Sequence, residues 1–398
     1  MHIAVLGLGP AGSVLAHRAV ARGWTVDGYD PACRGTDGSP TLPEWRSTYG
    51  LPVAALPDWA LTLIPFHSVS SALSAHTPDR RSLDYGGYGM IDRTLLRKRL
   101  SPGIRLHRRR VDAPTARTLG VDAVVDCRGV VDRPASVRQI AYGLFLPAGV
   151  AQAAGVTAAE FMDWRPSPRA AAQAASSHTE TSHTDSSTDT TRAEPSFLYI
   201  QDVGDRVLVE ETVLATRTAS REMLPELRLR LLSRLGEVAD HATGTETVHF
   251  PMDRRRRPWY LGPDADGVAT FGAAGGLTHP ATGYSVAAAV AAADTVLDQL
   301  VDHVAGSPPP CRQRLSAALA WRLRLLGGEL IIRADASVLP GFFDAFFRLP
   351  ADLQRGYLEG QDALPVAAAM ISLARFPRTV LPFLRPLPQA LYYTLKPR

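Results

Sequence analysis

Two adjacent carboxylates, Glu210 and Glu211, follow the apolar run at residues 207–209. Neighbouring side chains of an extended strand point to opposite faces, so one of the two should lie on the buried side of a half-covered sheet. Burial disfavours the charged form of a carboxyl group and raises its pKa, which makes the group a proton donor near neutral pH. The alternative interpretation is a strand end that carries two solvated acids.

A second candidate site is the sequence Gly-Leu-Gly-Pro-Ala-Gly at residues 7–12. Gly7 permits a tight turn from strand to helix, Gly9 lets a pyrophosphate approach the backbone, and Gly12 allows close packing of helix and strand. The free N–H groups of a helix that begins here would face the anion. Asp30 would accept a hydrogen bond from a ribose hydroxyl. The predicted dinucleotide-binding residues are Gly7, Gly9, Pro10, Ala11, Gly12 and Asp30.

The elements around this motif have the order that dinucleotide binding requires. An apolar strand is predicted at residues 3–6, an alanine-rich helix at 13–22 and a second strand at 25–29. A continuous apolar run at 121–126 predicts a buried parallel strand that ends at the cofactor.

A glycine-rich stretch at residues 271–285 (FGAAGGLTHPATGYS) precedes a predicted helix. Its four Gly and three Ala leave little room for side chains, so the backbone should lie against a flat, bulky group. A late turn of this kind suits FAD better than NAD, and the alternative is an ordinary loop. The predicted cofactor residues of this stretch are Gly272, Gly275, Gly276 and Tyr284.

Composition excludes several classes of protein. The formal net charge of +4 is small for 398 residues and no long basic tail is present, so no nucleic-acid partner is expected. The three cysteines are far apart and lack metal-ligand spacing, which predicts no zinc site and a reducing, cytoplasmic compartment. We expect neither a signal peptide, because a strand begins at residue 3, nor a transmembrane helix or an obligate protein partner.

The pattern of elements predicts an α/β fold with a Rossmann-like FAD-binding domain of the glutathione reductase or aromatic hydroxylase type. Residues 1–140 would form the first part of that domain and residues 256–305 its return segment. Residues 141–255 would form a β-sheet substrate domain, and residues 306–398 a helical C-terminal region. Within the substrate domain, residues 167–195 have almost no large apolar side chain, which predicts a disordered and dispensable surface insertion.

The sequence resembles the flavin-dependent lycopene cyclases. Four groups of segments carry the resemblance, in the family's order: residues 7–12 with 29–31, residues 139–143 with 161–165, residues 197–199 with 209–212, and residues 271–285. The third group includes Val-Glu-Glu-Thr, which is close to the acidic Phe-Leu-Glu-Glu-Thr motif of that family.

This resemblance implies an isomerase that holds FAD non-covalently in its reduced form and acts on a hydrophobic isoprenoid. An acid protonates a terminal alkene, an internal double bond attacks the cation, and proton loss completes the ring. The family's acid falls on Glu210, with Glu211 as its neighbour. NAD(P)H would serve only to reduce the flavin.

One departure from the family leaves the substrate open. Where the family has Pro-Met-Gly-Gly, this chain has Pro251 and Met252 followed by Asp253 and the arginines 254–257. These arginines are either a solvated loop or a site for a phosphate, which would favour a prenyl diphosphate or another non-carotenoid polyprenyl substrate. Rival functions are an NAD(P)H-dependent flavin monooxygenase or prenyl reductase, and a flavoprotein carrier without catalysis.

Two aromatic segments edged with arginine lie near the end of the chain, at residues 341–350 and 376–384. They are either core helices or a monotopic surface that rests on a bilayer. The second interpretation predicts peripheral membrane association.

Overall fold

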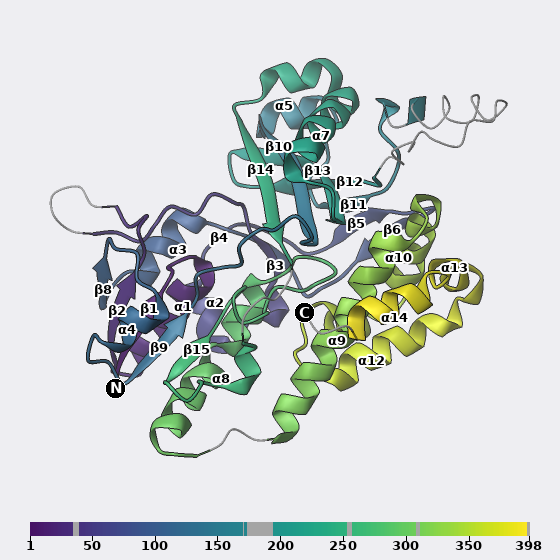
Figure 1. Ribbon diagram of the computed structural model, residues 1–398. Helices are drawn as coiled ribbons and strands as arrows, with labels where there is room; N and C mark the ends of the chain where they lie inside the picture. The colour runs from purple at the N-terminus through teal and green to yellow at the C-terminus, as the bar shows by residue number, and fades with distance from the viewer. Residues whose placement is uncertain (35–39, 170, 173–193, 253–256, 308–310, 396–398) are drawn as a thin grey trace.

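The computed structural model describes residues 1–34, 40–169, 171–172, 194–252, 257–307 and 311–395. The N-terminal α/β part lies at one side of the molecule, a long, mostly antiparallel sheet at its centre and top, and the C-terminal helices at the other side (Figure 1). The arginines 254–256 and most of the predicted insertion at 167–195 lie outside the described residues.

The N-terminal part contains a parallel sheet with the strand order β15-β9-β1-β2-β8. These strands are β1 (His2–Leu6), β2 (Thr25–Tyr29), β8 (Ile104–His107), β9 (Ala123–Asp126) and β15 (Val268–Thr270). The first three predicted strands are therefore present, and β15 brings a late segment beside β9. The α/β fold class predicted from the sequence is confirmed.

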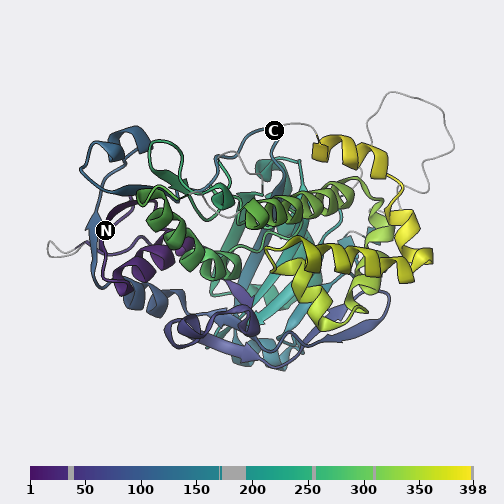
Figure 2. The ribbon, with the colours of Figure 1, turned by 90° about the horizontal axis from the view of Figure 1, so that it is seen from below.

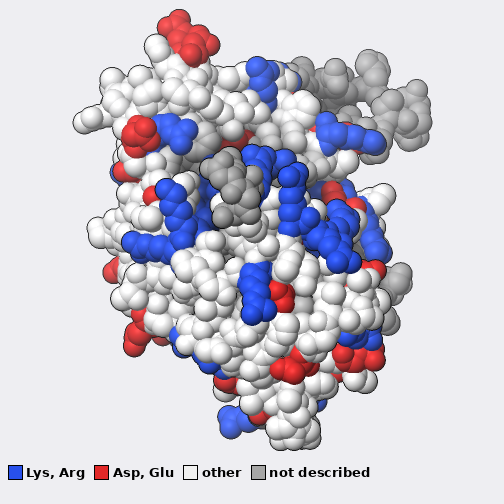
Figure 3. Space-filling view, turned by 90° about the vertical axis from the view of Figure 1, so that its left-hand side faces the viewer, with Lys and Arg blue, Asp and Glu red and all other residues white. Residues whose placement is uncertain are grey.

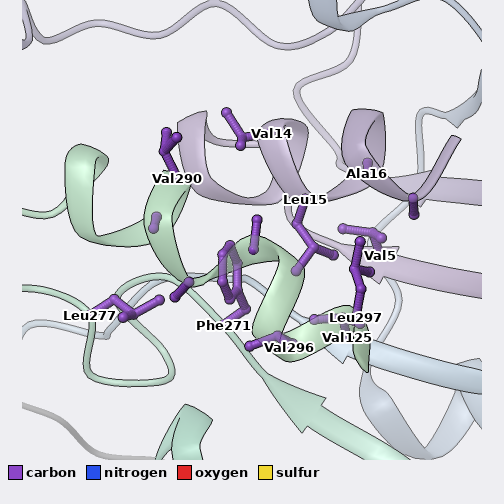
Figure 4. Close-up of a cluster of buried hydrophobic side chains, with 14 of the residues drawn as sticks. Val5, Val14, Leu15, Ala16, Val125, Phe271, Leu277, Val290, Val296 and Leu297 are labelled. Atoms are coloured by element: carbon purple, nitrogen blue, oxygen red, sulfur yellow. The ribbon is translucent and has the colours of Figure 1, made fainter. Parts of the chain in front are cut away.

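Helices α1 (Pro10–Ala21) and α8 (Val286–Val304) pack together against this sheet. Leu15, Phe271, Val290 and Leu297 are almost fully buried in the core that they share (Figure 4). At the surface, Arg18 and Arg22 of α1 both pair with Asp294 of α8, at 2.8 and 2.6 Å. The late segment is thus locked onto the N-terminal motif by apolar packing and by ion pairs.

The other short helices of this half are α2 (Asp58–Leu63), α3 (Arg93–Leu100) and α4 (Ala113–Arg117). The helix α3 begins after Asp92, which caps it by accepting a hydrogen bond from the Leu95 N–H at 2.9 Å. Lys and Arg side chains gather around the middle of this side of the molecule (Figure 3).

The large sheet has the strand order β14-β10-β13-β12-β11-β5-β6. Its strands are β5 (Leu73–His76), β6 (Arg80–Leu83), β10 (Arg138–Pro147), β11 (Glu160–Asp163), β12 (Phe197–Asp202), β13 (Arg206–Thr216) and β14 (Gly244–Pro251). A small antiparallel sheet has the strand order β3 (Gly50–Pro52), β7 (Tyr88–Ile91) and β4 (Phe66–Ser70).

Both faces of the large sheet are covered around β13. Helices α5 (Ala148–Ala153) and α7 (Ser220–Leu235) pack on one face, and the C-terminal helix α9 contacts the strand as well. Every residue of β13 after Arg206 is therefore buried. A strand in this position cannot carry solvated acids, so that interpretation of Glu210 and Glu211 is wrong.

The C-terminal region is helical, as predicted (Figure 2). It consists of α9 (Cys311–Arg333), α10 (Leu339–Phe347), α11 (Ala351–Leu358), α12 (Ala363–Ser372), α13 (Pro377–Phe383) and α14 (Leu387–Leu395). Among the described residues no single helix is long and apolar enough to cross a membrane, and only the bent pair Ala363–Arg375 and Pro377–Phe383 satisfies the length and composition criteria jointly.

The ends of the predicted insertion are fixed to the large sheet and to α7. Ser167 is buried, and the Arg169 N–H donates to the Ser233 hydroxyl at 3.0 Å. Glu194 accepts hydrogen bonds from the hydroxyls of Thr216 and Thr218 at 2.6 and 2.9 Å. The predicted boundaries of 167 and 195 are therefore too wide, because the residues at both ends make tertiary contacts.

Candidate active site

The turn after β1 requires glycine at two positions. Gly7 has φ +91°, and a Cβ there would lie 2.9 Å from the Arg128 Cα. A Cβ on Gly12 would lie 2.1 Å from the Gly7 carbonyl oxygen, so α1 can pack this closely on β1 only without a side chain. These two glycines maintain the fold of the turn.

Gly9 has a different environment. A Cβ built on it meets no atom within 4 Å, and Gly9 lines the main cavity at the start of α1. Asp30 lines the same cavity, and its carboxylate accepts hydrogen bonds from the N–H groups of Leu8 and Ala32 at 2.9 and 2.8 Å. An open, glycine-lined helix N-terminus beside a carboxylate is a site that fits a dinucleotide.

The late glycine stretch contributes to this cavity only in part. Gly272 lines it, has φ +62°, and would place a Cβ 2.8 Å from the Ala11 Cβ. Gly275 and Gly276 do not line it, and a Cβ on Gly275 would lie 2.8 Å from the Thr270 carbonyl oxygen. Those two glycines shape the loop, whereas Tyr284 lies in the cavity wall beside another tyrosine.

One cavity of about 610 Å³ extends from the glycine turn to the interior of the large sheet. At one end it is lined by the predicted dinucleotide residues, and at the other by Glu210, Tyr88, Tyr199 and Phe161. The structure thus brings most of the predicted site residues to one space, although they are far apart in the sequence.

Glu210 and Glu211 point to opposite faces of β13. Glu211 is fully buried on the α7 side, where it accepts a hydrogen bond from the Ser196 hydroxyl at 2.5 Å and pairs with Arg234 at 2.6 Å. Glu210 is 7% exposed and lines the cavity. Only Glu210 is therefore placed to meet a ligand, and Glu211 is part of a buried ion pair.

Aromatic side chains surround Glu210 on the cavity side. The Tyr88 hydroxyl lies 3.2 Å from the Tyr199 hydroxyl and 3.3 Å from that of Tyr284. The Phe161 ring contacts the rings of Tyr88 and Tyr284, and Phe347 of α10 packs on Phe161. Sequence analysis did not identify Tyr88, Tyr199 or Phe161 as site residues, because they come from three different strands.

Burial raises the pKa of Glu210 to about 8, with a further contribution from the negative charge of Glu246. One carboxyl oxygen of Glu210, Oε1, has no hydrogen-bond partner among the described residues. The group is therefore held as a neutral acid at neutral pH, inside a cavity with aromatic walls.

Glu246 of β14 is a further buried acid that was not predicted from the sequence. Along β14, Glu246 is buried while its neighbours Thr245 and Thr247 are exposed. An acid at a buried position of an alternating strand indicates a functional role, because a buried charge requires partners.

Arg257 is the described residue of the four-arginine run. Its guanidinium donates hydrogen bonds to the carbonyl oxygens of Leu261 and Gly262 at 3.1 and 3.0 Å. This arginine therefore holds the loop before β15.

A family model described as "Lycopene cyclase protein" matches residues 2–384. The chain is 29% identical to an uncharacterized carotenoid cyclase of Deinococcus radiodurans, over 93% of this chain and 88% of the relative. It is 27% identical to a lycopene beta cyclase of Synechococcus elongatus, over 93% and 92% of the two chains. A chloroplastic lycopene beta cyclase of Solanum lycopersicum is 26% identical, over 91% and 75%.

Solved structures share the fold at low sequence identity. A geranylgeranyl bacteriochlorophyll reductase-like protein of Thermoplasma acidophilum aligns with a TM-score of 0.59 and 11% identity, over 98% of each chain. A variant of 2-methyl-3-hydroxypyridine-5-carboxylic acid oxygenase aligns with a TM-score of 0.51 and 14% identity, over 92% of this chain and 97% of that one.

The raised pKa of Glu210 predicts a measurable dependence of stability on pH. Between its ordinary value of 4.5 and about 8, the folded protein retains a proton that the unfolded chain releases. Stability should therefore fall as the pH rises through this interval. In Glu210→Gln this contribution is removed, so the free energy of unfolding should decline less steeply over the same interval in chemical denaturation.

The matched control is Glu237→Gln, which removes an exposed carboxyl from the same part of the chain. Its unfolding free energy should follow the pH dependence of the parent protein. Identical slopes for the parent and Glu210→Gln would contradict a raised pKa at Glu210.

Proposed function

The chain belongs to the lycopene cyclase family, and on this premise we propose that it is a carotenoid cyclase in which Glu210 protonates a terminal alkene. The observation that carries the proposal is a neutral, buried carboxyl in an aromatic cavity that continues into a dinucleotide-type turn. Protonation of carbon requires an undissociated acid and the exclusion of water, and the position of Glu210 supports both.

The reaction is an isomerisation. The Glu210 proton adds to an alkene carbon, an internal double bond attacks the resulting cation to form a C–C bond, and a ring carbon then loses a proton. No atom or electron is gained or lost overall. The faces of Phe161, Tyr88 and Tyr284 line the space where positive charge develops, and aromatic faces stabilise cations electrostatically.

The proposed cofactor is FAD, held non-covalently by Gly7, Gly9, Pro10, Ala11, Gly12, Asp30 and Gly272, all of which line the cavity. When bound in reduced form, FAD would supply an electron-rich ring system that stabilises positive charge nearby. NAD(P)H would be needed only to reduce the flavin. Its consumption in proportion to product would instead support the monooxygenase or prenyl reductase alternatives.

Peripheral membrane association is also part of the proposal, with one change from the sequence-based expectation. The aromatic residues Phe343, Phe346 and Phe347 of α10 are buried, so residues 341–350 belong to the core. Exposed apolar side chains lie instead on α12 to α14, on Leu364, Ile371, Leu381, Leu391, Tyr392 and Leu395. Arg375, Arg378 and Arg385 are exposed between them, where they would suit anionic head groups.

The Glu210→Gln variant tests the catalytic assignment. It keeps the size of the side chain but removes the transferable proton, so cyclisation of lycopene should fall by roughly 10²- to 10⁴-fold while flavin content is unchanged. The measurement is product formation by chromatography and mass spectrometry. A product of unchanged mass but altered retention supports isomerisation, whereas an added oxygen or two added hydrogens would refute it.

Glu211→Gln serves as the comparison on the opposite face of the same strand. Breaking its buried pair with Arg234 should lower stability by about 3–5 kcal/mol, while the folded fraction still cyclises. Normal turnover by Glu210→Gln together with loss of turnover in folded Glu211→Gln would move the acid by one residue.

Gly9→Val tests the cofactor site without disturbing the fold. Because no protein atom lies near a Cβ at this position, the variant should fold normally but exclude a pyrophosphate from the turn. We expect loss of flavin absorbance in the purified variant and no uptake of added FAD. An unmodified protein that neither contains nor takes up FAD would refute the cofactor assignment.

Vesicle flotation tests the membrane proposal. The protein should float with vesicles of anionic lipid at low salt, and the double variant Leu364→Glu, Ile371→Glu should not, because two exposed apolar side chains become charged. Leu229→Glu, at an exposed apolar residue of α7, is the matched control and should float. A parent protein that stays at the bottom of the gradient would exclude this proposal.

A further inference from the structure

Glu246 lies in one row with Glu210 across the large sheet. Glu210 of β13 is opposite Gly143 of β10, and Gly143 is in turn opposite Glu246 of β14. On the other side of β13, Tyr199 of β12 is opposite Glu210. Directly opposed residues share a face of a sheet, so both carboxyl groups are on the cavity side.

The residue between the two carboxyl groups, Gly143, has no side chain, so the space above it is open to its neighbours. A Cβ on Gly143 would lie 2.6 Å from the Glu210 Cγ and 3.3 Å from its Oε1. The Glu210 side chain therefore leans into the space above Gly143, toward the strand that carries Glu246. Two buried carboxyl groups on one face of a sheet, with no side chain between them, cannot both ionise without a large penalty in free energy.

The surroundings of the two carboxyls differ. Glu246 accepts hydrogen bonds from the N–H and the hydroxyl of Thr48, at 2.9 and 2.7 Å. A guanidinium nitrogen of Arg93 is 3.9 Å from Glu246. Glu210 Oε1 has no such donor among the described residues. Burial raises the pKa of Glu246 as well, but the Thr48 donors and the Arg93 charge act in the opposite direction. Since a backbone N–H can only donate, these groups favour the negative charge on Glu246 over that on Glu210.

We propose that Glu246 is a fixed anion that keeps the pair's single proton on Glu210. Glu246 does not line the cavity, so it is a positioning residue that acts through Glu210. The catalytic role of this arrangement rests on the proposed function, but the location of the proton is a property of the protein without substrate.

The arrangement also accounts for the return of the proton. Once Glu210 has given its proton to an alkene carbon, two carboxylates face each other in a dry cavity. The C–H bond of the ring carbon then breaks, and its proton goes back to Glu210, which restores the starting state. The neighbouring anion makes Glu210 a stronger base at this step, so no second base is required.

The other titratable groups around the pair are tyrosines and Arg93. Burial raises the pKa of Tyr88, Tyr199 and Tyr284 above the usual value, and it raises that of Tyr49, near Glu246, to about 12. These phenols stay neutral in the range where Glu210 titrates. Within the described part of the chain, the proton that the two carboxyls share is thus the one that this cluster exchanges near neutral pH.

The test is infrared difference spectroscopy of the flavin-loaded protein during pH titration, without substrate. The carbonyl stretch of a protonated carboxylic acid should disappear with a midpoint near pH 8, and Glu210→Gln should lack this band. In Glu246→Gln the like charge is gone, so the midpoint should fall by about one pH unit or more. An unchanged midpoint in Glu246→Gln would overturn the proposal.

His249→Gln, on the opposite face of β14, is the matched control and should keep the parent midpoint. Thr48→Val keeps both carboxyls but removes one donor to Glu246, so part of the band should move to a second carboxyl. This variant decides the question if Glu246→Gln does not fold, and a band that stays wholly on Glu210 would then reject the proposal.

Activity separates this inference from the proposed function. If the protein cyclises lycopene, the alkaline limb of its pH–activity profile should shift to lower pH in Glu246→Gln and not in His249→Gln. A shifted infrared midpoint in a protein that makes no cyclised product would support the proton's location while rejecting the proposed reaction. A protein that cyclises lycopene, but whose infrared midpoint and alkaline limb are both unchanged in Glu246→Gln, would support the proposed reaction and reject the proposed location of the proton.

Discussion

A charged carboxyl that is taken out of water without a partner loses several kcal/mol of solvation, and this cost determines the chemistry of the β13 strand. Two adjacent glutamates are buried there and meet the cost in different ways. Glu211 keeps its charge, because Arg234 and Ser196 satisfy it on the α7 side. Among the described residues no cation pairs with Glu210 on the cavity side, and this carboxyl retains its proton instead. A sheet covered on both faces thus turns one acidic pair into a structural ion pair and a neutral acid.

The same cavity depends on contacts between segments that are far apart in the chain. Residues of the first turn, of the loop after β15 and of the large sheet all line it. Ion pairs from α1 to Asp294, together with the core around Phe271, hold the late loop against the N-terminal turn. The glycines shape these contacts, because Gly7, Gly12 and Gly275 each lie where a side chain would strike backbone. A Cβ on Gly9 would meet no protein atom. Within this motif Gly7 and Gly12 are therefore required for the fold, whereas Gly9 leaves space for the proposed cofactor.

Sequence analysis succeeded where the signal was local. The strand, glycine turn and helix at the N-terminus follow from neighbouring residues, and so does the opposite facing of Glu210 and Glu211. Glu246 and the tyrosine cluster were missed because they meet Glu210 through strand pairings that no local pattern specifies. Gly143 is an example, since its importance appears only once β13 and β14 are known to flank β10. The aromatic segment at 341–350 was ambiguous for a similar reason: periodicity shows that a helix has an apolar face but not what that face contacts.

The C-terminal helices connect the cavity to the outside of the molecule. Phe343, Phe346 and Phe347 of α10 form part of the cavity wall, and α10 packs on α13. The outward side chains Leu381 of α13 and Leu364 of α12 are apolar and exposed. A layer made of α10 and α13 therefore separates the cavity from the surface that we propose to rest on lipid. A long hydrocarbon would have to cross only this layer to reach Glu210, and its far end could remain in the bilayer while one end is cyclised. Under the proposed function, this path would bring a water-insoluble substrate to the acid without passage through solvent.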